Sequence, residues 1–192
     1  MSQMLFLARH GETTWNKEQR LQGARDIPLS SVGIEQAKLL AENLSRFSLD
    51  TIIASNLKRA YQTAAIVGKR LGVPVEKEPG FNEQSYGIFE GRLWPAVQKE
   101  LAARHETIDM YTEPPTDFVS RVIGTFTSTL KTHKNQHILI VCHGGVLRIL
   151  LHHLRKTPPA KGHIGYELPN GLAYMFRKGK SGWVEEDFVS TS

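Results

Sequence analysis

Two short apolar segments of this chain stop at the same dipeptide, His-Gly. The first covers residues 4–8 and leads through Arg9 to His10, and the second covers residues 138–142 and leads directly to His143. A short unbroken apolar run is typical of a strand that is buried on both faces of a parallel sheet. Ligands of such sheets bind beyond the carboxyl ends of the strands. The sequence therefore predicts two imidazoles at the edge of the sheet where a ligand binds.

Strand and helix patterns alternate along the rest of the 192 residues. This alternation predicts an α/β domain with a mainly parallel sheet. No repeat, low-complexity stretch or linker divides the chain, so we expect residues 1–192 to form one domain, with residues 81–115 as a cap over the site. The expected strands cover residues 4–8, 51–54, 73–76 and 138–142, with strand-like pieces near Tyr166, Tyr174 and Trp183. The expected helices cover residues 30–47, 57–71, 95–105, 116–133 and 145–154, with Ser30 as a cap and Gly72 as a terminator.

The composition restricts the partners of the chain. Hydrophobic residues make up 40% of it, which suits a globular domain, and no apolar run approaches the roughly 18 residues that cross a bilayer. One cysteine, Cys142, allows no internal disulfide and agrees with a reducing compartment. The net charge of +5 favours an anionic ligand, but the basic residues form no stripe interleaved with aromatics. We expect a cytoplasmic protein that binds a small anionic substrate, and neither nucleic acid nor a membrane.

The polar residues at the strand ends indicate phosphate chemistry. A guanidinium group pairs with phosphate oxygens in a bidentate fashion, and a neutral imidazole beside a phosphate can attack phosphorus. A carboxyl group near the leaving oxygen can protonate it and later deprotonate the attacking water. Clustered positive charge stabilises the transferring phosphoryl group without a metal. The residues expected there are Arg9, His10, Arg59 and His143 at strand ends, with Asn16 and Glu83 on adjoining loops.

Five motifs, in order along the chain, resemble the histidine phosphatase superfamily, the group that contains the phosphoglycerate mutases. The resemblance starts at residues 7–16, Leu-Ala-Arg-His-Gly-Glu-Thr-Thr-Trp-Asn, and continues through residues 26–37, 55–64 and 83–91. It ends at His143-Gly144 and so covers most of the chain. It implies a phosphoglycerate mutase-like fold, a three-layer α/β/α sandwich, with no cofactor and no metal.

The resemblance also implies a role for each matched residue. His10 is the phosphorylated nucleophile, and Glu83 is the proton donor. Two alternatives stay open, because Asn16 could serve only to stabilise its turn and residues 22–23 could be an ordinary loop tip. Near-relatives often carry Gly-Glu-Ser at residues 115–117, where this chain has Pro-Thr-Asp, so we assign no phosphate contact to that stretch. The residues expected to bind the phosphoryl group or the substrate are Arg9, Asn16, Gln22, Gly23, Arg59, His143 and Gly144.

Three functions are compatible with this resemblance: a phosphatase, a mutase, and a non-catalytic phosphate-binding module. Mutases usually carry Thr-Gly at residues 22–23, Asn-Ser at residues 145–146, and a longer basic insertion after the proton-donor motif. This chain has Gln-Gly, Gly-Val and a short segment, so it is more similar to the small broad-specificity phosphatases. The intact pair of His10 and Glu83 argues against a non-catalytic module. We expect a phosphoric monoester hydrolase of the histidine acid phosphatase type, a monomer or a homodimer, whose physiological substrate stays open.

Cys142 and Arg148 offer a competing interpretation, because their Cys-x5-Arg spacing is that of the cysteine-based phosphatases. That alternative leaves the Arg9-His10-Gly11 segment without a function. We therefore expect Cys142 to be buried at the strand end and Arg148 to be a structural ion-pair partner. Trp94 is expected to pack rather than to act as a lid. Four other histidines lack a metal-site pattern and are expected to be solvated or at helix ends: His133, His137, His152 and His153.

Overall fold

Strand β1 (Met4–Arg9) lies inside a six-stranded sheet, between one parallel and one antiparallel neighbour. The computed structural model describes residues 2–157 and 168–187. The other strands are β2 (Thr51–Ala54), β3 (Val75–Lys77), β4 (Ile138–Cys142), β5 (Ala173–Gly179) and β6 (Gly182–Glu186). The strand order is β3-β2-β4-β1-β5-β6, in which the first four strands pair in parallel and β5 and β6 pair antiparallel. The prediction of a mainly parallel sheet is confirmed.

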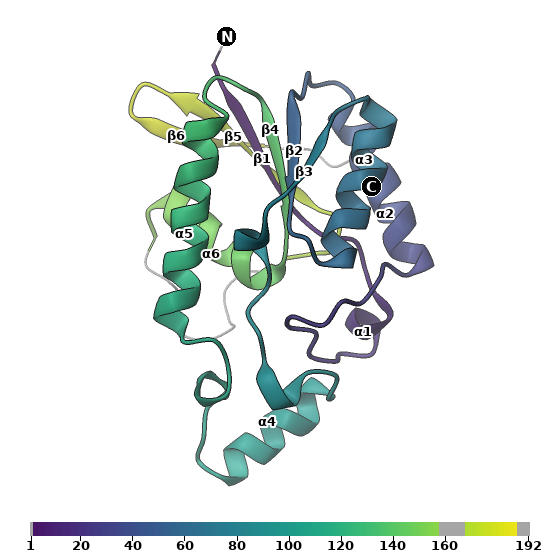
Figure 1. Cartoon of the computed structure of the whole chain (residues 1–192), viewed down its shortest axis with the longest axis vertical. Helices are drawn as coiled ribbons and strands as arrows, with labels where there is room; N and C mark the ends of the chain where they lie inside the picture. Colours follow the sequence, from purple (N-terminus) through teal and green to yellow (C-terminus); the bar gives the residue numbers. More distant parts are fainter. Residues whose placement is uncertain (1, 158–167, 188–192) are drawn as a thin grey trace.

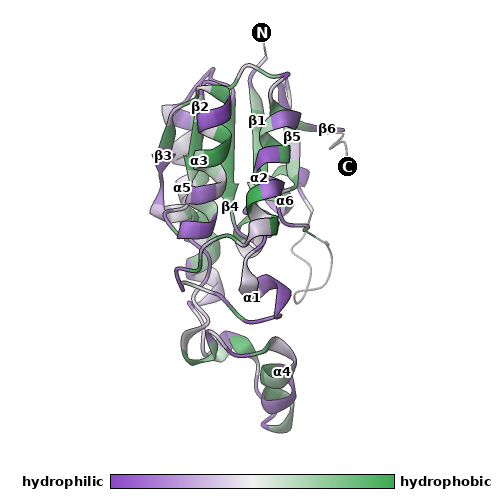
Figure 2. Ribbon diagram, turned by 90° about the vertical axis from the view of Figure 1, so that its right-hand side faces the viewer, coloured by the Kyte–Doolittle hydropathy of each residue, from purple (hydrophilic) through white to green (hydrophobic). Residues whose placement is uncertain are grey.

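Helices cover both faces of this sheet (Figure 1). The helices are α1 (Thr14–Lys17), α2 (Ser31–Leu44), α3 (Lys58–Leu71), α4 (Trp94–Ala103), α5 (Pro115–Thr132) and α6 (Gly144–Arg155). Alternate strand residues point to opposite faces, so Leu5 and Leu7 pack with α5 and α6. Phe6 and Ala8 pack with α2 and α3 on the other face. Figure 2 shows the hydrophobic strands enclosed between helices whose outer surfaces are largely polar, which is the predicted three-layer sandwich.

The helix ends follow local signals in the sequence. The Ser30 side chain accepts a hydrogen bond from the N–H of Gly33 and so caps α2, as predicted. Gly72 ends α3 in the left-handed conformation, with φ of 70°. The predicted helix to residue 47 is three residues too long, because α2 ends at Leu44 and a tighter turn follows, in which Phe47 N–H donates to Leu44 O.

One prediction about strands needs correction, two are confirmed, and one falls outside the described residues. The strand expected at residues 73–76 is β3, which begins only at Val75. Val73 N–H is bonded back to Gly68 O at the end of α3, and Pro74 has no N–H to donate to a ladder. The pieces expected near Tyr174 and Trp183 are the strands β5 and β6, and the piece near Tyr166 lies outside the described residues.

The long loop after β1 contains a helix that the sequence did not predict. This helix, α1, begins at a capping box in which Thr13 and Asn16 exchange hydrogen bonds. The recognised signature of that motif carries Glu or Gln at the fourth position, so Asn16 did not identify it. The short helix gives the loop a fixed shape next to the carboxyl end of β1.

The segment between β3 and α5 has a small apolar cluster of its own. Its buried members are Phe89, Val97, Leu101 and Ile108, and Trp94 packs against them, as expected for a packing residue. The segment includes α4 and the short 3-10 helices η2 (Gly87–Phe89) and η3 (Ile108–Met110). In Figure 1, α4 lies beyond the ends of the strands, at the same end of the molecule as α1. We call residues 81–115 the cap segment; whether it covers a bound substrate stays a prediction.

Candidate active site

The carboxyl ends of β1, β2 and β4 meet at one edge of the sheet, because these strands are parallel. His10 N–H continues the ladder to Cys142 O at 3.0 Å, and Ser55 N–H continues it to Val141 O at 3.1 Å. His143 follows β4 directly. A cavity of about 160 Å³ opens there, which we call the sheet-edge cavity. Its lining consists of Arg9, His10, Asn16, Arg20, Leu21, Gln22, Gly23, Arg59, Glu83 and Tyr86.

His10 is held as a neutral imidazole with one free ring nitrogen. Its Nδ1 lies 2.7 Å from Gly11 O, so Nδ1 carries the proton and donates it to that carbonyl. Burial, together with the positive charges of Arg59 and Arg9, holds the pKa of His10 well below its usual value. The lone pair therefore stays on Nε2. A buried, oriented and unprotonated imidazole is the arrangement that a nucleophile needs.

His143 lies beside His10, with their ring centroids 5.2 Å apart, but it does not line the sheet-edge cavity. Arg59 Nε donates to His143 Nδ1 at 3.2 Å, and His143 Nε2 donates to Ser55 Oγ at 2.7 Å. The Ser55 hydroxyl in turn donates to Asn82 Oδ1. Burial is the largest cause that holds the pKa of His143 well below its usual value. His143 thus supports Arg59 in this structure, and its phosphate contact stays a prediction.

Three guanidinium groups line the cavity, and one of them, Arg20, is paired with Glu18. The other two belong to Arg59 and Arg9. Arg59 is 1% exposed, and it donates to the carbonyl oxygens of Gly23 and Arg25 at 2.8 and 2.7 Å. Burial lowers its pKa to about 10, so the group remains a cation at neutral pH. Arg9 donates to Leu168 O at 2.6 Å, and its Nε has no partner among the described residues. The N–H groups that are not used in these bonds are available for phosphate oxygens.

Asn16 and Gln22 bring amide groups to the cavity. Asn16 Oδ1 accepts from the N–H of Thr13 at 3.0 Å, so the amide nitrogen Nδ2 is the end left for a ligand. The capping role and the phosphate-binding role that the sequence left open are therefore compatible. Gln22 Oε1 accepts from the Thr13 hydroxyl. Gly23 has φ of 52°, and a Cβ on it would lie under 3.0 Å from the Glu90 carboxylate, so no other residue fits this close approach.

Glu83 lies at the boundary between the cavity and helix α6. Its Oε2 accepts from the N–H of Gly145 at 3.0 Å, and its Oε1 accepts from the N–H of Gln84 at 3.1 Å. A Cβ on Gly145 would come within 3.0 Å of the Glu83 carboxylate, so the glycine makes this position possible. Glu90, by contrast, accepts bonds from Ala24 N–H and Tyr86 N–H and does not line the cavity. It positions the loop.

Sequence reasoning did not select Tyr86, Ser55 or Arg20 as site residues. Tyr86 and Arg20 line the cavity; burial raises the pKa of Tyr86, so its hydroxyl stays protonated. Ser55 follows a parallel strand as His10 and His143 do, and that signal could have found it. Arg148 was expected to form a structural ion pair; the structure shows no ion pair or hydrogen bond of its guanidinium within residues 2–157 and 168–187. Gly144 lies beside Arg9, outside the sheet-edge cavity.

The cysteine-based alternative is inconsistent with the structure. Cys142 is fully buried in the core between the sheet and α6. Burial raises the pKa of its thiol, whereas a nucleophilic cysteine requires a lowered pKa and access to the substrate. Among the residues that the structure describes, no group of three or more His, Cys, Asp or Glu side chains is placed to hold a metal ion. No helix in this described part is long and apolar enough to cross a membrane.

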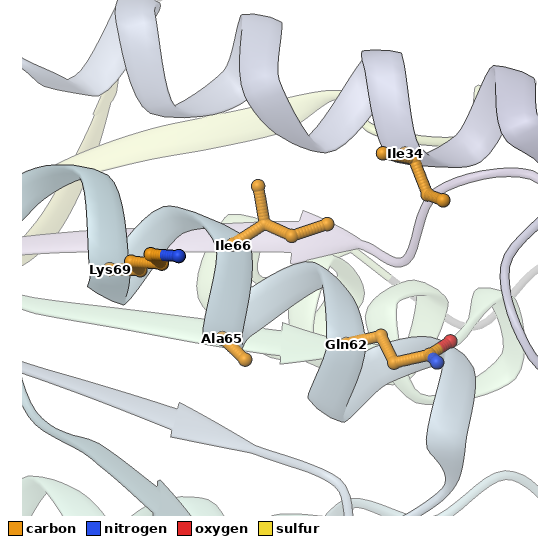
Figure 3. A pocket seen from close by; sticks show the side chains of 5 residues that line it. All are labelled: Ile34, Gln62, Ala65, Ile66 and Lys69. Carbon is orange, nitrogen blue, oxygen red and sulfur yellow. The ribbon is translucent and has the colours of Figure 1, made fainter.

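A separate hollow of about 320 Å³ lies on the outer surface of α2 and α3 (Figure 3). It is lined by Ile34, Gln62, Ala65, Ile66 and Lys69. This lining provides neither an acid nor a nucleophile poised for attack, and it lies on the helices rather than at the strand ends. The chemistry therefore belongs to the sheet-edge cavity.

The fold and the sequence have counterparts among known proteins. Residues 5–189 match the family model described as the histidine phosphatase superfamily (branch 1). The uncharacterized phosphatase PhoE of Bacillus subtilis is 35% identical over 145 residues, which cover 76% of this chain and 74% of that protein. The probable phosphoglycerate mutase GpmB of Yersinia pestis is 32% identical over 162 residues, covering 80% and 75%. The alpha-ribazole phosphatase structure from Shigella flexneri has a TM-score of 0.84 at 28% identity, covering 96% and 95%.

Proposed function

Because this chain belongs to the histidine phosphatase superfamily (branch 1), we propose that it hydrolyses phosphomonoesters of small metabolites through a phosphohistidine at His10. The proposal makes it a phosphoric monoester hydrolase of the histidine acid phosphatase type. One observation carries it: His10 is neutral, its Nε2 has no hydrogen-bond partner among the described residues, and its cavity is also lined by Arg9, Arg59 and Glu83.

In the first step, Nε2 of His10 attacks phosphorus. A P–N bond forms while the bond from phosphorus to the leaving oxygen breaks, and Glu83 in its acid form gives its proton to that oxygen. The free N–H groups of Arg9 and Arg59 stabilise the negative charge on the three phosphoryl oxygens. The hydrogen bond from His10 Nδ1 to Gly11 O keeps the imidazole in orientation throughout.

In the second step, the Glu83 carboxylate takes a proton from a water molecule whose oxygen attacks phosphorus. The P–N bond breaks, and its electron pair returns to Nε2 of His10. Inorganic phosphate leaves, and both residues regain their starting states. Arg59 is held by backbone carbonyls in both steps, so the charged groups need little rearrangement during the reaction.

The position of Gly145 supports hydrolysis over mutase activity. Mutases of the family usually carry Asn here, and a side chain at this position would force the Glu83 carboxylate to move. The similarity to GpmB nevertheless makes phosphoglycerate mutase activity the second candidate. A direct assay separates the two, because a mutase interconverts 2- and 3-phosphoglycerate, whereas the proposed enzyme releases inorganic phosphate.

The decisive experiment is to trap the intermediate. The protein is mixed with p-nitrophenyl phosphate and quenched in alkali, and phosphohistidine is located by mass spectrometry; we expect it at His10. His10→Ala should lose phosphohistidine and at least about 10⁴-fold in turnover. Cys142→Ala, which removes the buried thiol, should keep both. An active His10→Ala variant without phosphohistidine would refute the proposal. Chelation with EDTA should not reduce turnover, because arginines supply the positive charge.

We also propose that this reaction takes place in the cytoplasm, in a monomer or a homodimer. The residues that line the sheet-edge cavity include the proposed nucleophile and the proposed proton donor. The scattered basic residues and the small cavity fit a metabolite better than a polymer. Light scattering of the active protein determines the oligomeric state.

A further inference from the structure

Three hollows follow one another from His10 outward. The sheet-edge cavity shares Arg9, Glu83 and Tyr86 with a second hollow of about 230 Å³, which is also lined by Gly144, Gly145, Arg148 and Leu168. We call this the Arg148 hollow. It shares Tyr86, Gly145 and Arg148 with a third hollow of about 390 Å³, which is also lined by cap-segment and α5 residues. The shared lining residues show that the three hollows lie next to one another, in a path of adjacent hollows from the nucleophile, past Glu83, to Arg148.

Arg148 lies in this path, and its guanidinium forms no ion pair within the described part of the chain. Its side chain is half-buried, and its Nε is buried without a hydrogen-bond partner within residues 2–157 and 168–187. Nearby arginines differ: Arg121 forms an ion pair with Glu113 at 2.6 Å, and Arg155 forms one with Glu185. Leaving a buried donor unsatisfied costs free energy. An anionic ligand would satisfy the Arg148 group.

The carboxylate in the third hollow does not fill this role. Asp109 lines that hollow but is exposed to solvent, and it forms no ion pair with Arg148 within 4.0 Å in the described part of the chain. Two other charged groups line the Arg148 hollow, Glu83 and Arg9. Glu83 accepts from the backbone N–H groups of Gly145 and Gln84 and forms no ion pair with Arg148 in the described part of the chain. Burial lowers the pKa of Arg9, and the positive charge of Arg148 lowers it further, while Glu83 raises it. Two cations that repel each other across a hollow favour an anion between or beside them.

The place of Glu83 determines which part of the substrate meets Arg148. Glu83 lines both the sheet-edge cavity and the Arg148 hollow. In the proposed reaction it protonates the leaving oxygen, so the organic group attached to that oxygen extends into the Arg148 hollow. A planar guanidinium binds a carboxylate or phosphate in a bidentate fashion. The protonated Tyr86 hydroxyl adds a neutral donor on the same path.

We propose that Arg148 binds a second anionic group of the substrate, so that the preferred substrates are phosphomonoesters whose leaving group carries a carboxylate or a second phosphate. This inference rests on the proposed function, because it assigns Arg148 a place relative to the leaving oxygen. Arg148 contacts the substrate away from phosphorus and therefore acts on selectivity.

The test compares substrates that differ only in the second anion. The ratio of kcat/KM for 3-phosphoglycerate to that for glycerol 3-phosphate measures recognition of a carboxylate. The same ratio for propane-1,3-diol bisphosphate to its monophosphate measures recognition of a second phosphate. We expect the wild-type protein to prefer the member that carries the second anionic group in at least one pair, and the pair with the larger ratio identifies the anion.

Arg148→Gln should reduce the preferred ratio by about 10- to 100-fold, the effect of one charged bidentate contact. Arg148→Lys keeps the positive charge but loses the planar guanidinium that binds an anion in a bidentate fashion, so it should reduce this ratio less. Arg70→Gln is the matched control: it removes one positive charge from the exposed surface of α3 and should leave both ratios unchanged.

Several outcomes would overturn the inference. If the wild-type protein shows no preference in either pair, Arg148 does not bind an anion, and this result needs no variant. An Arg148→Gln variant that keeps the wild-type ratio leads to the same conclusion. If the wild-type protein releases no phosphate from any of the four compounds or from p-nitrophenyl phosphate, the proposed function has failed and the inference fails with it. Phosphate release without discrimination refutes the inference alone.

Discussion

The sheet edge and the cap segment are held in place in different ways. At the sheet edge, a single side chain, Arg59, is tied by hydrogen bonds to His143, Gly23 and Arg25. The cap segment has four buried apolar residues of its own and meets the loop after β1 through backbone bonds around Leu21 and Leu93. In the proposed reaction, the phosphoryl group therefore binds to a rigid hydrogen-bonded site, while the leaving group contacts a segment that packs around its own apolar cluster. Substitutions at the sheet edge should change kcat, and those in the apolar cluster of the cap segment should change KM.

Among the variants that compare the two regions, the largest effect is expected for Glu83→Gln, where the regions meet. An alkoxide needs the proton from Glu83, so hydrolysis of glycerol 3-phosphate should slow by about 10²–10⁴-fold. Nitrophenolate leaves without that proton, so with p-nitrophenyl phosphate only the second step should slow. Stopped-flow assays should then show a burst of nitrophenol before a slow steady state. Equal slowing on both substrates with no burst would reduce Glu83 to a positioning residue.

Gly145→Ala should act on the same carboxylate indirectly. The new Cβ would displace the Glu83 carboxylate, and we expect kcat for alkyl phosphates to fall by about 10- to 100-fold, since catalysis depends on placement within about 1 Å. Gly124→Ala is the control, because a Cβ there meets no atom within 4 Å in the middle of α5. That variant should keep its activity and gain stability. Similar loss in both variants would show that Gly145 acts only through the fold.

The two histidines at the sheet edge should make stability depend on pH. Both have a pKa held well below the unfolded value of about 6.5. Below that pH the unfolded chain takes up protons that the folded chain does not. The contribution of the two histidines to the free energy of unfolding is therefore fully present above pH 6.5 and is lost as the pH falls. Each histidine lowers the free energy of unfolding by about 1.4 kcal/mol per pH unit, which is tenfold in the unfolding equilibrium.

Urea unfolding between pH 7 and pH 5 measures this slope. His10→Asn should remove about half of the pH dependence of the unfolding free energy that these two histidines cause. His105→Asn changes an exposed histidine of the cap segment and is the matched comparison. If both variants lose the same slope, the pH dependence does not come from the sheet edge.

The smallest effect is expected in the cap segment. Leu101 is 4% exposed within the cap cluster, and Leu101→Ala creates a cavity there. We expect KM for glycerol 3-phosphate to rise a few-fold, which corresponds to the loss of about one weak contact with the substrate. The value of kcat should stay nearly unchanged, because no residue of the sheet edge loses a hydrogen bond. Leu39→Ala, on the exposed side of α2, is the control. A fall in kcat with constant KM would show that the cap segment positions the catalytic groups.

Local signals explain why much of the fold was predictable. The strand predicted at residues 51–54 has the same bounds as β2, because four buried apolar or β-branched residues are followed by a turn. Ser30 and Gly72 determine their helix ends through their own backbone geometry. Helix α1 was missed because only four residues form it, and its stability comes from one capping box.

The candidate site was predictable only in part, since its details depend on contacts between distant residues. The strand ends located His10, Arg59 and His143, but the sequence contains no sign that His143 would use both ring nitrogens within the protein. The absence of a described partner for Arg148 depends equally on side chains far along the chain. Position at a strand end predicts which residues meet, whereas the direction of each hydrogen bond requires the three-dimensional packing.

The burial of Cys142 makes the proposed chemistry insensitive to oxidants. It is the only thiol of the chain, it is fully covered, and its raised pKa keeps it from forming the thiolate that peroxide attacks. The proposed nucleophile is instead an imidazole, which does not form the sulfenic, sulfinic and sulfonic acids to which a thiolate is oxidised. We therefore expect turnover to survive peroxide at concentrations that oxidise a reactive catalytic cysteine.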